Sequence, residues 1–252
     1  MLKFSDATKQ AKLKTLVKVP GLKQYLAKGR KLYTFSLLAG YSCPMASECL
    51  SKVVVKDGKR SIKDGKRTLF RCFSATQEAT YTATYEQRKH NFETLRRLDE
   101  DAMYTAINQS LPKNTGIVRI HVSGDFFNQR YFNAWVRVAQ SHPDVLFYAY
   151  TKSLPYWLAA KSTVDSLDNL ILTASHGGTR DDLIESHSLR SVKVVMSTLE
   201  ANWLPIDHDD SHAADPTLRT QDFALLIHGT QPKGSAAAAA KKELAGLGSY
   251  SR

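Results

Sequence analysis

The chain has 252 residues, 42% of them hydrophobic and 23% charged, with a formal net charge of +11 at pH 7. This length fits one large domain, or a domain with an extension, and allows a substantial core without disulfides. No apolar run approaches the roughly 18 residues of a membrane-spanning helix, and the N-terminus lacks an apolar signal core. The sequence therefore predicts a cytoplasmic protein without a membrane partner.

The positive charge is concentrated in the N-terminal third of the chain. Residues 1–72 contain 17 basic and four acidic residues, a net charge of +13. Such asymmetry indicates an anionic partner, of which nucleic acid is the usual one, or else a solubilising surface.

The first elements in chain order are basic and β-rich. Residues 1–31 read as a basic N-terminal extension with a short helix or two, broken at Pro20-Gly21. A strand over 32–38 opens a single α/β domain that we expect to span 32–252. An insertion over 50–73 has two Asp-Gly pairs, at 57–58 and 64–65, and each is a tight-turn signal. It predicts a small β-meander made of β-hairpins.

The rest of the chain alternates between helical and strand patterns. Residues 74–110 are helical in composition. Apolar strands are then expected at 117–122, 145–150, 170–174, 192–196 and 223–227, and helices at 128–141, 154–167, 181–189 and 235–244. Near-continuous apolar strands between helices indicate a parallel sheet covered by helices. About six β/α units are few for a closed eight-stranded barrel, so we expect a partial barrel or an open sheet.

Each expected strand ends in small or polar residues, and the carboxyl ends of parallel strands are where α/β proteins bind ligands. We therefore predict a functional mouth at these ends, in which Gly124 lets a ligand approach the backbone closely. His121 is taken as a buried strand residue and left out. The candidates for binding and proton transfer are Asp125, Lys152, His176, Glu200 and His228.

The three cysteines follow the first strand. Cys43 and Cys49 lie in one loop, and Cys72 returns after the insertion. Thiolates on a wrapping loop suit a soft metal, and neighbouring basic residues lower thiol pKa values. The sequence offers three thiolate ligands and no evident fourth. This favours a [4Fe-4S] cluster with one open iron, and a small molecule or His90 would coordinate that iron. Zinc, which prefers four ligands and paired C-x2-C spacing, and no metal at all stay open.

Five motifs stand out along the chain: SLLAGYSCPMASEC at 36–49, RCF at 71–73, RKHNF at 88–92, RIHVSGDFF at 119–127 and FYAYTKS at 147–153. Together they resemble a phage-encoded family, usually called gene product eighty-eight. The resemblance covers residues 32–153, and more loosely the rest. It implies a viral or prophage origin, hence the host cytoplasm, and little about activity. Some members carry further cysteines near the C-terminus; this chain has none there, so no second metal site is expected.

A wider likeness is to the radical S-adenosylmethionine superfamily. It implies a partial α/β barrel, a cluster on Cys43, Cys49 and Cys72, and S-adenosylmethionine bound at Ser123-Gly124-Asp125. The chain departs from that superfamily in spacing, since it has C-x5-C-x22-C where the superfamily has C-x3-C-x2-C.

Three functions remain open at this point. The first is a viral iron–sulfur protein acting as a radical-SAM-like or other cluster-dependent enzyme. The second is a basic nucleic-acid-binding protein with a structural or redox iron–sulfur or zinc site. The third is a virion component with a structural metal. For the second, phosphate contacts are expected from Lys56, Lys59, Arg60, Lys63, Lys66 and Arg67.

Overall fold

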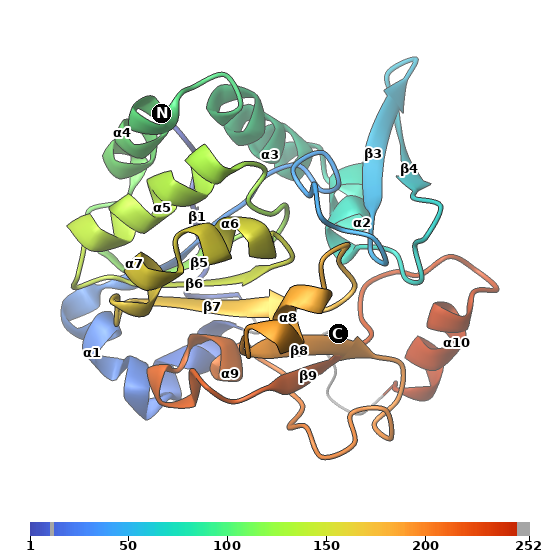
Figure 1. Ribbon diagram of the computed structural model, residues 1–252. Coiled ribbons are helices and arrows are strands. Elements are labelled where there is room, and N and C mark those ends of the chain that lie inside the picture. The colour runs from blue at the N-terminus through green and yellow to red at the C-terminus, as the bar shows by residue number, and fades with distance from the viewer. Residues whose placement is uncertain (11–12, 246–252) are drawn as a thin grey trace.

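A seven-stranded, mostly parallel sheet organises the chain in the computed structural model, which describes residues 1–10 and 13–245 (Figure 1). Its order is β1-β2-β5-β6-β7-β8-β9; β1 is antiparallel to β2, and the other neighbours are parallel. Strands that lie in chain order without closing confirm the predicted open sheet or partial barrel. The bounds are β1 (Ser5–Asp6), β2 (Lys31–Phe35), β5 (Thr115–Ile120), β6 (Leu146–Thr151), β7 (Leu170–Ser175), β8 (Ser191–Val195) and β9 (Phe223–Leu226).

Helices connect these strands. No helix in the described residues is long and apolar enough to cross a membrane. The α-helices are α1 (Lys23–Leu26), α2 (Phe73–Thr80), α3 (Thr82–Leu95), α4 (Glu100–Ser110), α5 (Gln129–Ser141), α6 (Leu154–Ala159), α7 (Lys161–Asp165), α8 (Asp182–Ser186), α9 (Ser211–Ala214) and α10 (Ala236–Glu243). Short 3-10 helices are η1 (Leu13–Lys18), η2 (Pro20–Leu22), η3 (Ala27–Gly29) and η4 (Pro216–Leu218).

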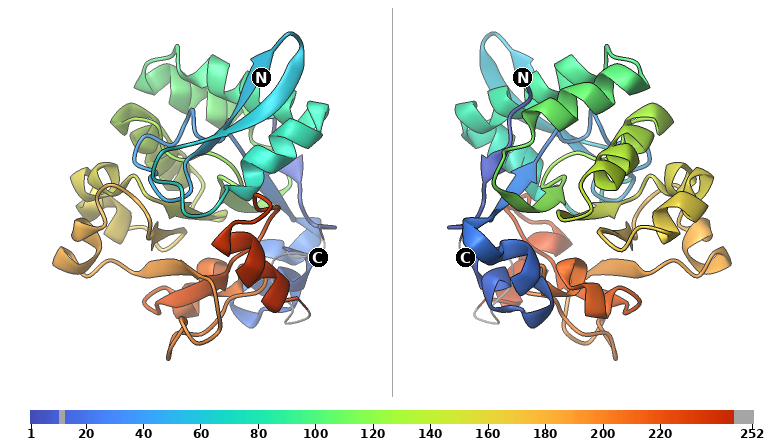
Figure 2. Two further views of the ribbon diagram at one scale, coloured as in Figure 1. Left: turned by 90° about the vertical axis from the view of Figure 1, so that its right-hand side faces the viewer. Right: turned by 90° about the vertical axis from the view of Figure 1, so that its left-hand side faces the viewer.

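The two faces of the sheet bury different partners, because side chains alternate along each strand. Val118 and Phe147 belong to the large core between the sheet and helices α3 to α8. We call this side of the sheet the outer face. Ile117 and Tyr148 face the other way, towards η1, η2 and α9, which cover the inner face. In Figure 2 the blue helical segment Leu13–Gly29 lies away from the green helices α3 to α5.

The predicted helical stretch 74–110 is three helices rather than one. Tyr81 has an extended backbone (φ −107°, ψ 110°), which separates α2 from α3. Asp99 begins α4 as its N-cap, with its side chain accepting a hydrogen bond from the Ala102 amide at 2.8 Å. A capping aspartate satisfies an amide that the first helical turn leaves free, so it fixes a new helix start.

The insertion is a single hairpin, β3 (Ser51–Lys56) and β4 (Lys59–Asp64), which projects beside α2 (Figure 1). Asp57 and Gly58 form its turn with φ of 50° and 73°, which suits an Asp-Gly pair. The second Asp-Gly pair makes no hairpin turn, because the Gly65 amide donates to the Leu50 carbonyl at 2.7 Å. That bond returns the chain to the base of the hairpin.

Candidate functional site

A cavity of about 160 Å³ lies at the carboxyl ends of the parallel strands. The loops after β2 and β5 to β7, the ends of β8 and β9, and the segment before α2 all contribute to its wall. All three cysteines line it, in a setting otherwise composed of apolar and strand-end polar side chains. The lining residues are Cys43, Ala46, Cys49, Phe70, Arg71, Cys72, Phe73, Ser74, Arg119, His121, Val122, Ser123, Gly124, Asp125, Tyr150, Thr151, Lys152, Ser175, Val194, Leu225, Ile227 and His228.

The loop that carries Cys43 and Cys49 is fastened across the strand ends to the loop after β7. The Ser47 and Glu48 amides both donate to the Gly177 carbonyl, at 3.1 and 3.0 Å. Gly177 has φ +89°, and a Cβ there would lie 2.8 Å from a Glu48 carboxylate oxygen, so a side chain at this position would be strained and crowded. This attachment holds the two thiols over the mouth.

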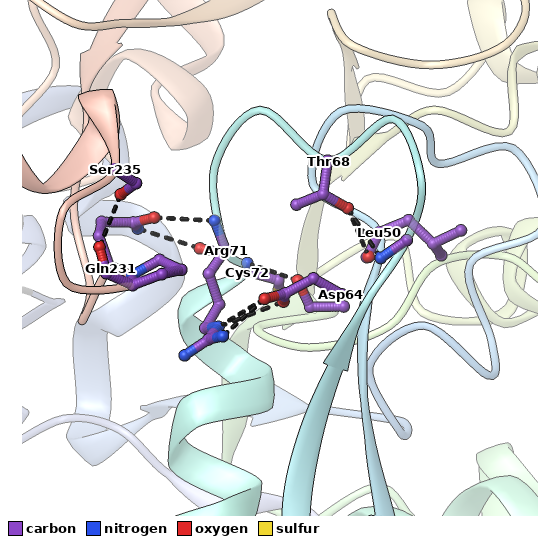
Figure 3. Close-up of polar contacts among 10 residues, drawn as sticks. Leu50, Asp64, Thr68, Arg71, Cys72, Gln231 and Ser235 are labelled. Atoms are coloured by element: carbon purple, nitrogen blue, oxygen red, sulfur yellow. Dashed lines mark hydrogen bonds and ion pairs between the residues drawn. The ribbon is translucent and has the colours of Figure 1, made fainter.

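Cys72 is held from two other sides. Its amide donates to Ser51 Oγ in the hairpin at 3.2 Å. The Arg71 amide donates to Gln231 Oε1 at 2.8 Å, and the Arg71 guanidinium pairs with Asp64 at 2.6 Å (Figure 3). Residues 70–72 therefore bridge the hairpin and the loop after β9, and the third thiol reaches the cavity from that bridge.

Two of the partly buried thiols, those of Cys43 and Cys72, are held in their protonated form. Burial raises the pKa of Cys43 well above its ordinary value, and the nearby Asp125 carboxylate raises it further. Burial likewise raises the pKa of Cys72 to about 11. Because the thiolate is the reactive form, these two groups are weak nucleophiles near neutral pH.

Asp125, in the loop after β5, is bonded to the end of β6. Its Oδ1 accepts from Thr151 Oγ1 at 2.6 Å and from the Phe126 amide at 2.7 Å, and its Oδ2 accepts from the Lys152 amide at 2.8 Å. Burial raises the pKa of Asp125 against the lowering effect of these hydrogen bonds. The Lys152 ammonium points on to the next strand end, where it donates to Ser175 Oγ and the His176 carbonyl at 2.7 and 2.6 Å. Both groups thus stabilise the wall of the cavity.

His121 is a buried polar residue of the wall that is not among the candidates predicted from the sequence. It has φ +68°, which is uncommon for a residue with a side chain. Its Nε2 lies 2.9 Å from the Tyr131 hydroxyl, whereas Nδ1 has no hydrogen-bond partner among the described residues. Burial lowers the pKa of His121 to about 3, so the ring is neutral at pH 7. It lines the cavity with one hydrogen-bonding function unused.

Two buried ion pairs support the wall from behind. Glu78, fully buried, accepts at Oε1 from the Ala39 amide, Ser123 Oγ and Arg88 Nη1 at 3.0, 2.9 and 3.1 Å. Burial raises the pKa of Glu78, an effect that the Arg88 guanidinium opposes.

On the inner face, Arg119 pairs with Asp210. Asp210 also accepts from the hydroxyls of Tyr148 and Tyr150 at 2.9 and 3.2 Å. Arg119 and Tyr150 line the cavity, so this pair forms part of its wall.

Comparison with known proteins assigns the chain to a family. The model of the family described as Gene product 88 matches residues 2–245. The chain belongs to the Gene product 88 family. The Gene 88 proteins of Mycobacterium phages L5 and D29 are each 30% identical to it over 122 residues. Those matches cover 45% of this chain and 44% and 43% of the relatives, so the chain spans less than half the length of the curated relatives it matches.

These comparisons support the predicted bacteriophage family but not the wider likeness. No solved structure matches the chain. The resemblance to the radical S-adenosylmethionine superfamily has no support among the comparisons, and S-adenosylmethionine binding at Ser123, Gly124 and Asp125 stays a prediction.

The predicted metal function of this Gene product 88 family member is wrong. Across residues 1–10 and 13–245, no three histidine, cysteine, aspartate or glutamate side chains are placed to hold a metal ion together. Cys43, Cys49 and Cys72 share a cavity, but separate contacts position them, and all three are free thiols. The iron–sulfur protein with an open iron is thereby overturned, as is the iron–sulfur or zinc site of its nucleic-acid-binding alternative.

The other predicted site residues divide into two groups. Asp125, Lys152 and His228 line the cavity, as do Ser123 and Gly124. The remaining two candidates, His176 and Glu200, are not among the lining residues. The His176 ring lies 3.8 Å from Asp181, and Glu200 is exposed and accepts from the Met196 amide at 2.7 Å.

Proposed function

We propose that this protein binds a small, partly apolar molecule with a hydrogen-bonding polar group in the cavity at the strand ends. The observation that carries the proposal is His121 Nδ1, a buried polar atom without a partner among the described residues, in the wall of that cavity. Buried polar groups in proteins are normally hydrogen-bonded, so an unused one in a cavity favours a ligand or water as its partner.

The size and lining of the cavity define the class of ligand. A volume of about 160 Å³ resembles that of an apolar cavity that admits benzene, about 150 Å³. Phe70, Phe73, Val194, Leu225 and Ile227 supply apolar wall. The His121 ring supplies a donor or an acceptor, depending on its tautomer. A small ring or short chain with one amide, hydroxyl or carboxylate group matches this combination.

The strand-end position agrees with this proposal. Ligands of parallel α/β proteins bind at the carboxyl ends of their strands, and this cavity draws on the ends of β5 to β9. That analogy concerns position alone. The hydrogen bonds of Asp125 and Lys152 already stabilise the wall of the cavity. Catalytic roles stay predictions for these two residues and for the other candidates, His176, Glu200 and His228.

The proposal is tested with benzamide, benzyl alcohol and benzoate as probes, with binding followed by ligand-observed NMR and thermal melting. At least one probe should bind the native protein and raise its melting temperature. Val194→Phe, which fills the cavity, should abolish binding. The matched control Val55→Phe, at a position exposed by 52% on the hairpin, should leave it unchanged.

A second variant tests the polar contact. His121→Asn keeps a residue type that tolerates positive φ. It should weaken the best probe about 2- to 10-fold, the effect of losing one net hydrogen bond. Binding that survives in Val194→Phe, or the absence of binding by every probe to the native protein, would refute the proposed function.

A further inference from the structure

On one face of the hairpin of β3 and β4, four of the six residues are lysine. In its antiparallel ladder Lys52 lies opposite Lys63, Val54 opposite Ser61, and Lys56 opposite Lys59. Because side chains alternate along a strand, these six residues share one face, which we call the lysine face. None of the six is acidic. Lys56, Lys59 and Lys63 are exposed, and Lys52 is partly exposed.

The opposite face of the hairpin is used for packing. Val53 is buried, and Arg60 donates to the Ala79 carbonyl and to Thr82 Oγ1 at the junction of α2 and α3. Its guanidinium also lies over the Tyr85 ring. The hairpin is therefore anchored by one face, and the lysine face is turned away from α2. Arg60, predicted as a phosphate contact, belongs to the anchor.

Like charges opposite one another destabilise a β-ladder. Two such lysine pairs stand in one hairpin, and the acids near them do not compensate. Asp64 is paired with Arg71 on the other face, and Asp57 lies in the turn. An anionic partner on the lysine face would remove this repulsion.

We propose that the lysine face binds the phosphate backbone of duplex DNA. The two lysine pairs are four residues apart, or roughly 13 Å along the strands. Duplex DNA carries one negative charge per about 1.7 Å of its axis, and its major groove, about 12 Å wide, admits a two-stranded β-ribbon. The projecting hairpin is such a ribbon.

Features of the same face favour duplex DNA over other anions. Proteins that bind single strands stack bases on aromatic side chains. None of the six residues of the lysine face is aromatic, and the neighbouring Tyr41 ring is already covered by the Lys52 ammonium, 5.0 Å from its centroid. The major groove of duplex RNA is too deep and narrow for side chains to read. Contacts made by lysines to phosphates carry no sequence information, so the binding is expected to be independent of sequence.

The test measures the affinity of the full chain for a short fluorescent DNA duplex by anisotropy, at salt concentrations from about 50 to 200 mM. Four phosphate contacts predict a slope of about −3.6 for log K against log salt. Replacing Lys56→Gln and Lys59→Gln together should lower affinity about 10- to 100-fold near 0.1 M salt and reduce the slope by about 2. Lys56→Arg with Lys59→Arg should keep the binding.

The matched control is Lys23→Gln with Lys28→Gln, which makes the same change in net charge on exposed positions near α1, on another part of the molecule (Figure 1). It should change the affinity less than about 3-fold. An equal loss in this control, or full binding by the Lys56→Gln, Lys59→Gln variant, overturns the proposal. So does equal or tighter binding to the single strand, or to vesicles containing phosphatidylserine.

Discussion

Thr151 Oγ1 donates a hydrogen bond of 2.6 Å to Asp125 Oδ1, and this bond joins the last residue of β6 to the loop after β5 in the wall of the cavity. The same hydroxyl oxygen accepts from the Ser153 amide at 2.9 Å. One side chain thus satisfies a buried carboxylate and a buried amide where β6 ends.

Removing this hydroxyl should destabilise the protein. Thr151→Val keeps the shape of the side chain but takes away one hydrogen bond from Asp125 and the acceptor of the Ser153 amide. We expect a loss of about 1 to 3 kcal/mol in the free energy of unfolding, measured by urea denaturation. Thr151→Ser keeps the hydroxyl and should lose less than half as much; equal losses would contradict the assigned role.

Gly124 should tolerate a side chain far less well than Gly58. Both have positive φ, +88° and +73°, so alanine is strained at either. At Gly124 a Cβ would also lie 2.5 Å from Ser42 Oγ and 2.8 Å from Leu37 Cβ, whereas at Gly58 nothing lies within 4 Å. We expect Gly58→Ala to cost about 1 to 2 kcal/mol and Gly124→Ala about 1 to 3 kcal/mol more. Thermal and urea unfolding of the two variants check the order.

Acidification should weaken the fold through His121. Its pKa is lowered from 6.5 to about 3, so the unfolded chain binds more protons between those values and stability falls as pH falls through that range. Above pH 6.5 the ring is neutral in both the folded and the unfolded chain, and no stability is lost through this residue. Between pH 7.5 and about 4.5 we expect a loss of about 2 to 3 kcal/mol from this residue. The loss should be absent in His121→Asn; parallel pH profiles for the two proteins would rule the effect out.

Relieving one lysine pair should stabilise the hairpin in the absence of any partner. Lys63→Thr removes the charge opposite Lys52 and adds a residue suited to strands. We expect a gain of about 0.2 to 1 kcal/mol at low salt, which shrinks as salt screens the repulsion. Lys66→Thr removes the same charge outside the ladder and should give no comparable gain. Equal effects from both variants would show that net charge, rather than the cross-strand pair, is responsible.

Most of the fold could be predicted from the sequence because the parallel strands are buried on both faces and therefore read as apolar runs. The expected strand at 170–174 appears as Leu170–Ser175, and that at 223–227 as Phe223–Leu226. The edge strand Ser5–Asp6 was missed, since two polar residues carry no β pattern and its pairing with β2 is made by the backbone.

The site was predictable only in position. Small and polar residues at strand ends located the mouth, and Asp125, Lys152 and the three cysteines do line one cavity. Spacing carries no information about where side chains point, and so the metal hypothesis failed. His121 was missed because its apolar neighbours made it resemble a core residue. Glu78 lies in a helix, where the sequence gives no sign that its carboxylate reaches Ala39 and Ser123.

The strand order has a consequence for how the chain folds during synthesis. From β6 onwards each strand pairs with the one made just before it, so the sheet can grow as the ribosome releases each crossover. The pairing of β2 with β5 is different, because the hairpin and helices α2 to α4 lie between them in the sequence. Until β5 emerges, the edge of β2 that pairs with it has no parallel neighbour. The nascent chain is therefore most exposed to misfolding or chaperone capture during the interval between these two strands.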